Sequence, residues 1–252
     1  MTDRIPPGRA CLQELAAQRR LPTHQPMDQM TLQWIVDNRP VNFDAAPSFP
    51  RPGLMLVPAR SWFTTPSQAD SIHGVLHNAR VSLLAVLLAQ EYGLEDDDVA
   101  AVCAAGAVHD CRRRDDRADA GHGRRAASWF RHHTNTVTGA LGRPVAPAAL
   151  HRAAEAIAVH DVPYEDFAAQ QKRAYRAAPH LVVVLKAADC LDRYRLPLQR
   201  WWPDLTRLRT PVADWLPPAA FALVVRSEQG ALDGATHHHA LTTARQSLAR
   251  GQ

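Results

Sequence analysis

The sequence predicts an all-α protein. Several segments space their apolar residues at the helical period, and none shows the apolar–polar alternation of a half-buried strand. Glycine, proline or acidic residues stand where these helices would begin or end. At 252 residues the chain can form one large domain or two small ones with a sizeable core.

The N-terminal region, residues 1–66, is polar and interrupted by prolines. We expect an irregular arm that packs on the core, with a short helix within residues 11–20 and another near residues 31–36. The aromatic residues of the arm are then anchors on the core rather than a platform that stacks nucleic-acid bases.

A long helix is expected through residues 72–92, where the apolar positions keep helical spacing and Gly93 is a typical C-terminal stop. Ser67 or Asp70 is the candidate N-terminal cap of this helix.

The next helix is expected at residues 96–108. Three aspartates open it, where the helix dipole favours negative charge. The apolar, alanine-rich residues that follow indicate burial on most of the circumference. The helix ends in His109-Asp110, an imidazole beside a carboxylate.

The second half of the chain has the same helical character. Residues 112–121 and 139–147 are expected to form loops. Helices are expected at residues 122–131, 148–160, 180–195, 218–229 and 236–250. Residues 181–185 alone resemble a strand, but residues 186–192 continue the 3.6-residue period and favour a buried helix. The predicted organisation is an arm, a helical domain at residues 67–200 and a helical C-terminal extension at residues 201–252.

The composition argues against several classes of function. The net charge is +4, but the basic excess is spread along the chain, so we expect no nucleic-acid partner. No stretch reaches the ~18 apolar residues of a membrane span, and the N-terminus lacks an apolar signal segment. The four cysteines form no CxxC pair. We therefore expect a cytoplasmic protein with no membrane partner, and the sequence predicts no oligomeric state.

Four candidate metal ligands lie on three of the expected helices: His77, His109, Asp110 and Asp189. Each helix has a strong apolar face, so each side chain can point into the interior of a bundle. Two imidazoles and two carboxylates leave open positions on an octahedral divalent metal. Such positions let a metal activate water and polarise a phosphoryl oxygen. Alone, each residue is typical of a core histidine, a helix end or a buried ion pair.

Four blocks of sequence resemble, in order, the HD superfamily of metal-dependent phosphohydrolases. The blocks are HGVLHNARV at residues 73–81, the dipeptide His109-Asp110, the pattern HDxxRxxDxxDxxHG with Arg113, Asp116, Asp119 and His122-Gly123, and KAADCLD at residues 186–192. The match covers about residues 73–195. Lys186 departs from it, because an acidic residue often opens the last block, and Asp115 stands where asparagine is frequent.

The resemblance implies an HD-domain helical bundle, hydrolysis of a phosphate ester, and a divalent metal (Mn, Mg, Fe, Ni or Zn) held by His77, His109, Asp110 and Asp189. Whether one or two ions bind stays open. Asp110 is also a candidate general base that orients the attacking water.

Further residues are candidates for substrate contact. His73 is expected on the same helix face as His77, where it could contact the substrate or serve in a loop or cap. Arg80 and Arg113 could bind a phosphate bidentately or form solvated salt bridges. Asp116 and Asp119 could orient these groups, hold a second metal or pair with nearby arginines.

Two further positions extend the candidate catalytic site. His122 could complete a second metal site or stabilise a transferring phosphate. His160-Asp161 resembles the position of a further histidine in some family members and is otherwise a helix end.

The predicted function is removal of phosphate from a small phosphomonoester, with a nucleotide as the favoured partner, by metal-activated water. The alternatives are an HD-type di-iron oxygenase, in which His122, His160 and Asp161 would be added ligands, a nuclease or cyclic-nucleotide phosphodiesterase, and a non-catalytic nucleotide-binding module.

Overall fold

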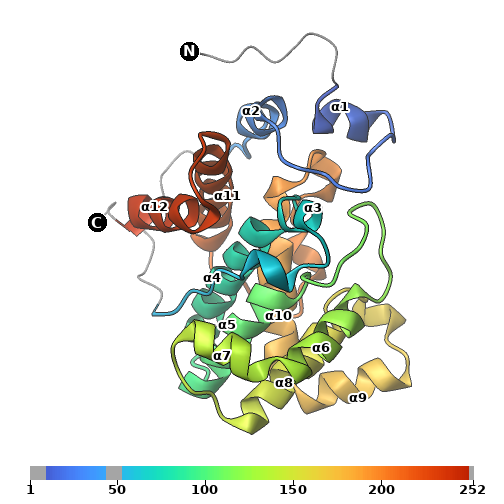
Figure 1. Ribbon diagram of the computed structural model, residues 1–252, viewed down its shortest axis with the longest axis vertical. Helices are drawn as coiled ribbons and strands as arrows, with labels where there is room; N and C mark the ends of the chain where they lie inside the picture. Colours follow the sequence, from blue (N-terminus) through green and yellow to red (C-terminus); the bar gives the residue numbers. More distant parts are fainter. Residues whose placement is uncertain (1–9, 44–52, 250–252) are drawn as a thin grey trace.

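The computed structural model describes residues 10–43 and 53–249, and within these ranges the chain forms helices and no strand (Figure 1). The all-α prediction is confirmed. The α-helices are α1 (Leu12–Ala17), α2 (Gln29–Asp37), α3 (Pro66–Ala69), α4 (Val75–Glu91), α5 (Asp96–Val108), α6 (His122–His132), α7 (Thr134–Leu141), α8 (Pro147–Val159), α9 (Ala169–Ala177), α10 (Pro179–Leu191), α11 (Leu216–Leu232) and α12 (His237–Ala249). Short 3-10 helices lie at η1 (Arg60–Trp62), η2 (Tyr164–Asp166), η3 (Asp192–Arg195), η4 (Gln199–Trp201) and η5 (Leu205–Arg207).

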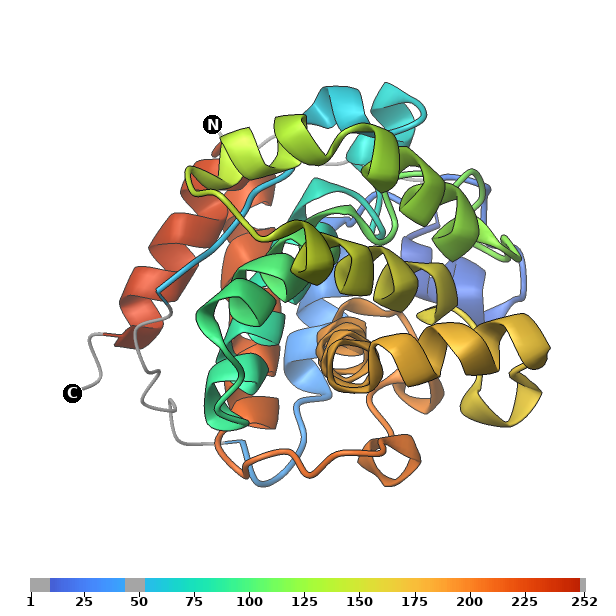
Figure 2. The same ribbon diagram turned by 90° about the horizontal axis from the view of Figure 1, so that it is seen from below.

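Helix α10 lies in the middle of the bundle. Helices α4, α5, α8 and α9 pack against it, and Figure 2 shows it end-on among them. Residues 75–89 of α4 and 99–108 of α5 are all buried. The predicted burial of α5 on most of its circumference is confirmed, and residues 181–185 belong to helix α10 rather than to a strand.

Two glycines determine how closely neighbouring helices approach. A Cβ added to Gly106 in α5 would lie 2.7 Å from the backbone of Ser82 in α4. A Cβ added to Gly123 in α6 would lie 2.7 Å from the carbonyl oxygen of Ile157 and 2.9 Å from Nδ1 of His160. Any larger residue would separate these helix pairs. The close packing brings the end of α5 beside the start of α4, and the start of α6 beside the end of α8.

The arm and the C-terminal helices share one hydrophobic core with the central helices. Ile35 of α2, Trp62 of η1, Leu223 of α11 and Leu241 of α12 belong to the same buried cluster as α4 and α5. Helix α11 packs against α2, α4 and α12. These contacts place α2, α11 and α12 beside the central helices (Figure 1).

The start of α4 differs from the sequence-based expectation. Thr65 caps the short helix α3, and α4 begins only after Gly74. Neither Ser67 nor Asp70 caps α4, because a turn separates α3 from α4. His73 lies in that turn and not on the helix.

Two other differences concern α7 and α9. The loop expected at residues 139–147 begins only at Gly142, because α7 continues to Leu141 and Gly142, with φ 75°, is its C-terminal stop. Helix α9 has no counterpart among the predicted helices. Ala174 is its only buried residue, so the apolar spacing that identifies a helix is missing.

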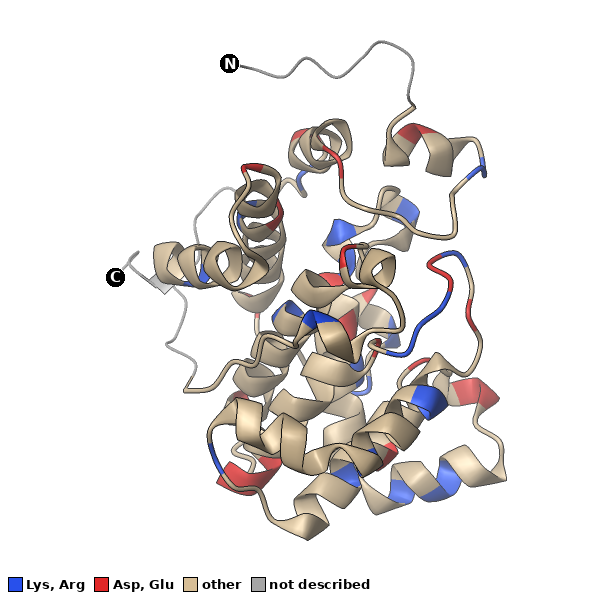
Figure 3. Cartoon of the chain, viewed as in Figure 1, with Lys and Arg blue, Asp and Glu red and all other residues tan. Residues whose placement is uncertain are grey.

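Acidic and basic residues are interspersed along the chain (Figure 3). Figure 3 shows basic residues on many elements with acidic residues between them. Among the described residues, no helix is both long and apolar enough to cross a lipid bilayer.

Candidate metal centre

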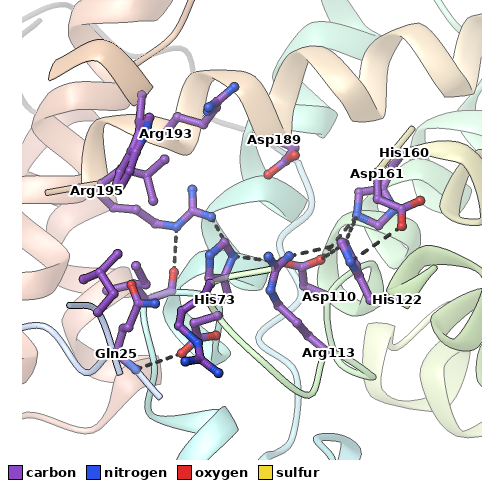
Figure 4. Close-up of a pocket in the computed structure, with 16 residues that line it drawn as sticks. Gln25, His73, Asp110, Arg113, His122, His160, Asp161, Asp189, Arg193 and Arg195 are labelled. Carbon is purple, nitrogen blue, oxygen red and sulfur yellow. Dashed lines mark hydrogen bonds and ion pairs between the residues drawn. The ribbon is translucent and has the colours of Figure 1, made fainter. Parts of the chain in front are cut away.

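Four imidazoles converge on one buried carboxylate, that of Asp110. His77 lies in the first turn of α4 and His122 begins α6, whereas His109 and His160 follow the last residues of α5 and α8. All four side chains are buried. Figure 4 shows Asp110 beside His122 and His160 at the inner end of a cavity.

His77 and His109 form what we call the first pair. Their Nε2 atoms lie 3.1 Å apart. Oδ1 of Asp189 lies 3.4 Å from Nε2 of His77 and 3.7 Å from Nε2 of His109. Oδ2 of Asp110 lies 3.6 Å from Nε2 of His77. The structure therefore brings together the four residues that the sequence nominated as metal ligands.

His122 and His160 form the second pair, with Nε2 atoms 3.2 Å apart. Oδ1 of Asp110 lies 2.8 Å from Nε2 of His122 and 3.3 Å from Nε2 of His160. Each oxygen of Asp110 thus faces one pair. Asp161 lies behind His122, and its Oδ1 atom is buried without a hydrogen-bond partner among the described residues.

The four imidazoles are held in one tautomer. Each donates its Nδ1–H to a fixed oxygen at 2.7–2.8 Å: His77 to the carboxylate of Asp192, His109 to the carbonyl of Gly106, His122 to the carbonyl of Asp119 and His160 to the carbonyl of Ile157. This leaves each Nε2 lone pair directed at the other pair member and at Asp110. Histidines that bind metals are oriented in this way.

The electrostatics of the cluster favour a bound cation. Two Nε2 lone pairs about 3 Å apart repel each other unless positive charge lies between them. Burial opposes charge on His122, but the carboxylate of Asp110 outweighs burial and raises the pKa of His122. Burial would likewise raise the pKa of Asp110, yet His122 and Arg113 hold that pKa well below its ordinary value. The carboxylate is therefore ionised.

These donors fit a divalent metal. Imidazole nitrogens and carboxylate oxygens are ligands of Mn, Fe, Ni and Zn. Three overlapping groups of buried or half-buried residues place their ligand atoms within 4.8 Å of one another: His73, His77 and Asp110; His77, His109 and Asp189; and His109, Asp110 and His160. A His/Asp cluster that could hold metal is therefore present in the interior of the bundle.

A buried charge network supports the first pair from behind. Asp192 accepts a hydrogen bond from His77 and one from Nε of Arg80 at 2.6 Å, and Nη1 of Arg80 lies 2.7 Å from Glu228 in α11. Arg80 and Asp192 are fully buried. Burial opposes the charge on Asp192, but Arg80 and His77 outweigh it and lower the pKa.

This placement corrects the prediction that Arg80 contacts a phosphate. The guanidinium extends away from the cavity towards α11, where carboxylates and Ser227 occupy it. Arg80 acts instead on the orientation of His77, through Asp192.

A cavity of about 400 Å³ opens onto the cluster. We call it the first cavity. Its lining comes from the arm, the cluster and the segment after α10: Leu21, Gln25, Ile72, His73, Asp110, Arg113, Asp116, Arg117, His122, His160, Asp161, Asp189, Arg193, Arg195, Leu196 and Trp201. His73, Asp110, Arg113, His122 and His160 lie side by side along this lining (Figure 4).

His73 and Arg113 lie at the cluster and line the first cavity. Nδ1 of His73 is 3.0 Å from Oδ2 of Asp110 and 3.0 Å from Nη2 of Arg195. Burial and the two nearby guanidinium groups, of Arg113 and Arg195, hold the pKa of His73 well below its ordinary value. Nη1 of Arg113 is 3.4 Å from Oδ2 of Asp110 and 3.4 Å from Nε2 of His122.

Asp116 lines the cavity but is occupied by protein donors. It accepts hydrogen bonds from the backbone N–H of Gln25 at 2.8 Å, from Nε2 of Gln68 at 2.6 Å and from Ser71 at 3.2 Å. Burial raises its pKa. These contacts attach the arm to the wall of the cavity, so Asp116 positions the arm.

Asp119 does not line the cavity. Its carboxylate accepts hydrogen bonds from the backbone N–H of Arg114 and from the side chain of Arg125, while its carbonyl orients His122. The side chain of Asp119 therefore pairs with a nearby arginine, which is one of the roles expected from the sequence.

Sequence reasoning missed Arg195 and Asp192. Arg195 is buried; it donates to the carbonyl of Ile72, and its Nη2 lies 3.3 Å from Nε2 of His77. Both residues follow Asp189 within two helical turns. Asp192 closes the KAADCLD block and Arg195 lies in the next turn, and this position beside Asp189 was the signal that could have identified them.

Comparison of the chain with protein-family models, with curated proteins and with solved structures finds no match. Functional inference therefore rests on the geometry of the cluster and on the sequence motifs.

Proposed function

We propose that this chain is a metal-dependent phosphohydrolase of the HD superfamily, with two ions that share Asp110 and a small phosphomonoester as substrate. The observation that supports the proposal is the arrangement of four Nε2 atoms in two close pairs, one on each side of the Asp110 carboxylate.

Each half of the cluster supplies its own ligands. His77, His109 and Asp189 would hold one ion, and His122 and His160 would hold the other. Asp110 would contribute one oxygen to each. Oδ1 of Asp161, which has no hydrogen-bond partner among the described residues, is a further potential ligand atom beside the second pair. Divalent ions in such a site supply Lewis-acid polarisation of a phosphoryl oxygen and a lowered pKa for a bound water.

The residues around the cluster suit an anionic substrate. Arg113 and Arg195 border the cavity on either side of His73, and both direct N–H groups to its polar end. Guanidinium groups bind phosphate oxygens in a bidentate manner and stabilise charge that develops on them. Neutral His73 can donate or accept one further hydrogen bond.

The cavity also limits the size of the substrate. A volume of about 400 Å³ is within the usual range of ~300–1,000 Å³ for small-molecule sites. Ile72, Leu196 and Trp201 give the cavity an apolar side, which suits the base or sugar of a nucleotide. A mononucleotide is therefore the substrate that we would test first.

Phosphate release from a panel of nucleoside monophosphates, with Mn²⁺, Mg²⁺, Fe²⁺, Ni²⁺ or Zn²⁺ added, tests the proposal. Asp110→Asn should reduce turnover by about 10³-fold or more, because an essential metal ligand is lost. Asp98→Asn is the matched control, since Asp98 pairs with Arg152 and neither residue lines the cavity. Equal turnover by wild type and Asp110→Asn would reject the proposal.

A second candidate is a di-iron oxygenase. This chemistry needs histidine and carboxylate ligands beyond those of one metal site. His122, His160 and Asp161 are placed to supply them, and this arrangement favours the candidate. Iron content and oxygen consumption distinguish the two candidates. Two irons per chain with substrate-dependent oxygen uptake, and no phosphate release with any metal, would support the oxygenase.

A further inference from the structure

A second cavity adjoins the metal centre. Its volume is about 630 Å³, and it shares His160, Asp161, Asp189 and Arg193 with the first cavity. The rest of its lining comes from the segment after α8, from α10 and from the region of η5: Val162, Pro163, Tyr164, Glu165, Lys186, Cys190, Asp204, Arg207, Leu208 and Arg209. A molecule that extends from the first cavity past Asp189 would enter the second.

Arg193 stands where the two cavities meet. Its side chain is half-buried and makes no hydrogen bond or ion pair within residues 10–43 and 53–249. Figure 4 shows its guanidinium without a dashed contact, whereas the neighbouring Arg195 is bonded to other residues. Arg193 is therefore a cation at the junction whose donors are available to a ligand.

Two more cations line the second cavity without a carboxylate partner in the described parts of the chain. Nζ of Lys186 donates to the carbonyls of His160 and Val162 at 2.8 and 2.7 Å, and it lies 4.8 Å from the centre of the Tyr164 ring. The guanidinium of Arg209 lies 4.2 Å from the same ring. The ring of Tyr164 thus holds both cations near one wall of the cavity.

The acidic residues of the cavity form no ion pair with these three cations in the described parts of the chain, although Asp161, Glu165 and Asp189 lie near enough to Lys186 to interact with its charge. Asp204 pairs with Arg207 at 3.0 Å, and Asp189 faces the first pair of imidazoles. Asp161 accepts hydrogen bonds from backbone N–H groups at the start of α6. The carboxylate of Glu165 is exposed at the edge of the cavity.

We propose that the second cavity binds a second anionic group, a phosphate or a carboxylate, of the same substrate whose phosphomonoester lies at the metal centre. This inference rests on the proposed function and names its substrate class, a small molecule with two anionic groups. Guanidinium groups match both phosphate and carboxylate oxygens, and a half-buried guanidinium binds them more strongly than an exposed one because the surrounding dielectric is lower.

Three synthetic phosphomonoesters of matched length test the inference: 3-hydroxypropyl phosphate, 3-phosphonooxypropanoate and propane-1,3-diyl bisphosphate. The measured quantity is the kcat/KM of each doubly anionic compound divided by that of the hydroxypropyl compound. We expect a ratio of about ten or more in the wild type, as for one charge-assisted hydrogen-bonded pair. The ratio for the carboxylate compound, set against the ratio for the bisphosphate, shows which of the two anionic groups the second cavity prefers.

Arg193→Gln and Arg209→Gln should each lower this ratio by about fivefold or more, through KM. Arg176→Gln is the matched control, because Arg176 is exposed on α9 and lines neither cavity. It should leave the ratio unchanged. A wild-type ratio near one, or a ratio that neither Arg193→Gln nor Arg209→Gln changes, overturns the inference while the proposed function stands.

Failure of the proposed function gives a different result, the absence of phosphate release from all three compounds. In that case the Kd of the same proteins for propane-1,3-diyl bisphosphate, measured by calorimetry, decides the inference. A Kd that rises about tenfold in Arg193→Gln but not in Arg176→Gln upholds an anion site. No measurable binding, or an equal Kd in all variants, overturns it.

Discussion

The two imidazole pairs of the cluster are built in different ways. The first pair lies on the buried helices α4 and α5 and is oriented in part by a side-chain charge network of Asp192, Arg80 and Glu228. The second pair lies at the start of α6 and just after α8, and backbone carbonyls orient both of its imidazoles.

This difference shows two solutions to the same problem, the fixing of Nε2 in a buried site. The first pair depends on buried charges that must all be present, because removal of one leaves the others unpaired. The second pair depends on the close approach of α6 and α8 at Gly123. The two pairs should therefore respond to different substitutions.

The largest effect is expected for Arg80→Gln. It removes the cation that Asp192 and Glu228 share and leaves Asp192, among the arginines, only the longer contact with Arg195 at 3.5 Å, and breaking a buried pair costs about 3–5 kcal/mol of unfolding free energy. Arg152→Gln, which breaks a partly exposed pair with Asp98, should cost about 1 kcal/mol or less. Urea unfolding measures both values. Equal costs would contradict the distinction between the two kinds of pair.

Gly123→Ala should disturb the second pair selectively. The added methyl group would press on the carbonyl of Ile157 and on His160, and such overpacking costs about 1–3 kcal/mol. We expect loss of the ion at the second pair with retention of the other. Gly139→Ala is the control, because nothing lies within 4 Å of the added atom on α7, and it should stabilise the helix by about 0.5–1 kcal/mol. Metal content after equal loading is the measurement, and loss of both ions in Gly123→Ala would count against independent pairs.

Asp192→Asn should weaken metal binding at the first pair by about 10–100-fold, the usual cost of losing a carboxylate that orients a histidine ligand. Affinity at the second pair should change little, because carbonyls orient its imidazoles. Titration with Mn²⁺ would separate the two affinities. Asp98→Asn serves as the control, and an equal loss at both pairs would contradict the prediction.

A smaller effect is expected from acid. Arg80 and His77 outweigh burial and hold the folded-state pKa of Asp192 below its unfolded value. Between the two pKa values the unfolded chain binds more protons, so this contribution to stability is complete above about pH 4 and is lost as the pH falls through the folded pKa. The urea midpoint of metal-free protein should decline below about pH 4. A decline of the same size in Asp192→Asn would show that another group is responsible.

The sequence predicted the first pair because its ligands follow the apolar pattern of their helices. His77 and His109 lie on segments whose neighbours are all buried, so an inward direction could be inferred. The second pair stayed an alternative because His122 follows a charged loop and His160 ends a helix of mixed polarity just before Pro163, whereas His109 ends an apolar one. Helical periodicity predicts no direction for a side chain at such positions.

The prediction for Arg80 failed for a different reason. Its long side chain reaches partners that lie 112 and 148 residues further along the chain. Local spacing identifies the helix face of Arg80 but not the carboxylates that α11 and η3 bring to that face. The all-α class, by contrast, depends on local patterns alone and could be predicted in full.

The number of ions per chain tests the central claim most directly. The whole protein would be loaded with Mn²⁺, dialysed and analysed by mass spectrometry of the metal, together with His109→Gln and His160→Gln. We expect about two ions in the wild type and about one in each variant, because each substitution removes a ligand of one pair only. A single ion that His160→Gln leaves in place would contradict the shared Asp110 centre. The absence of metal from a folded wild-type protein would contradict the metal site itself.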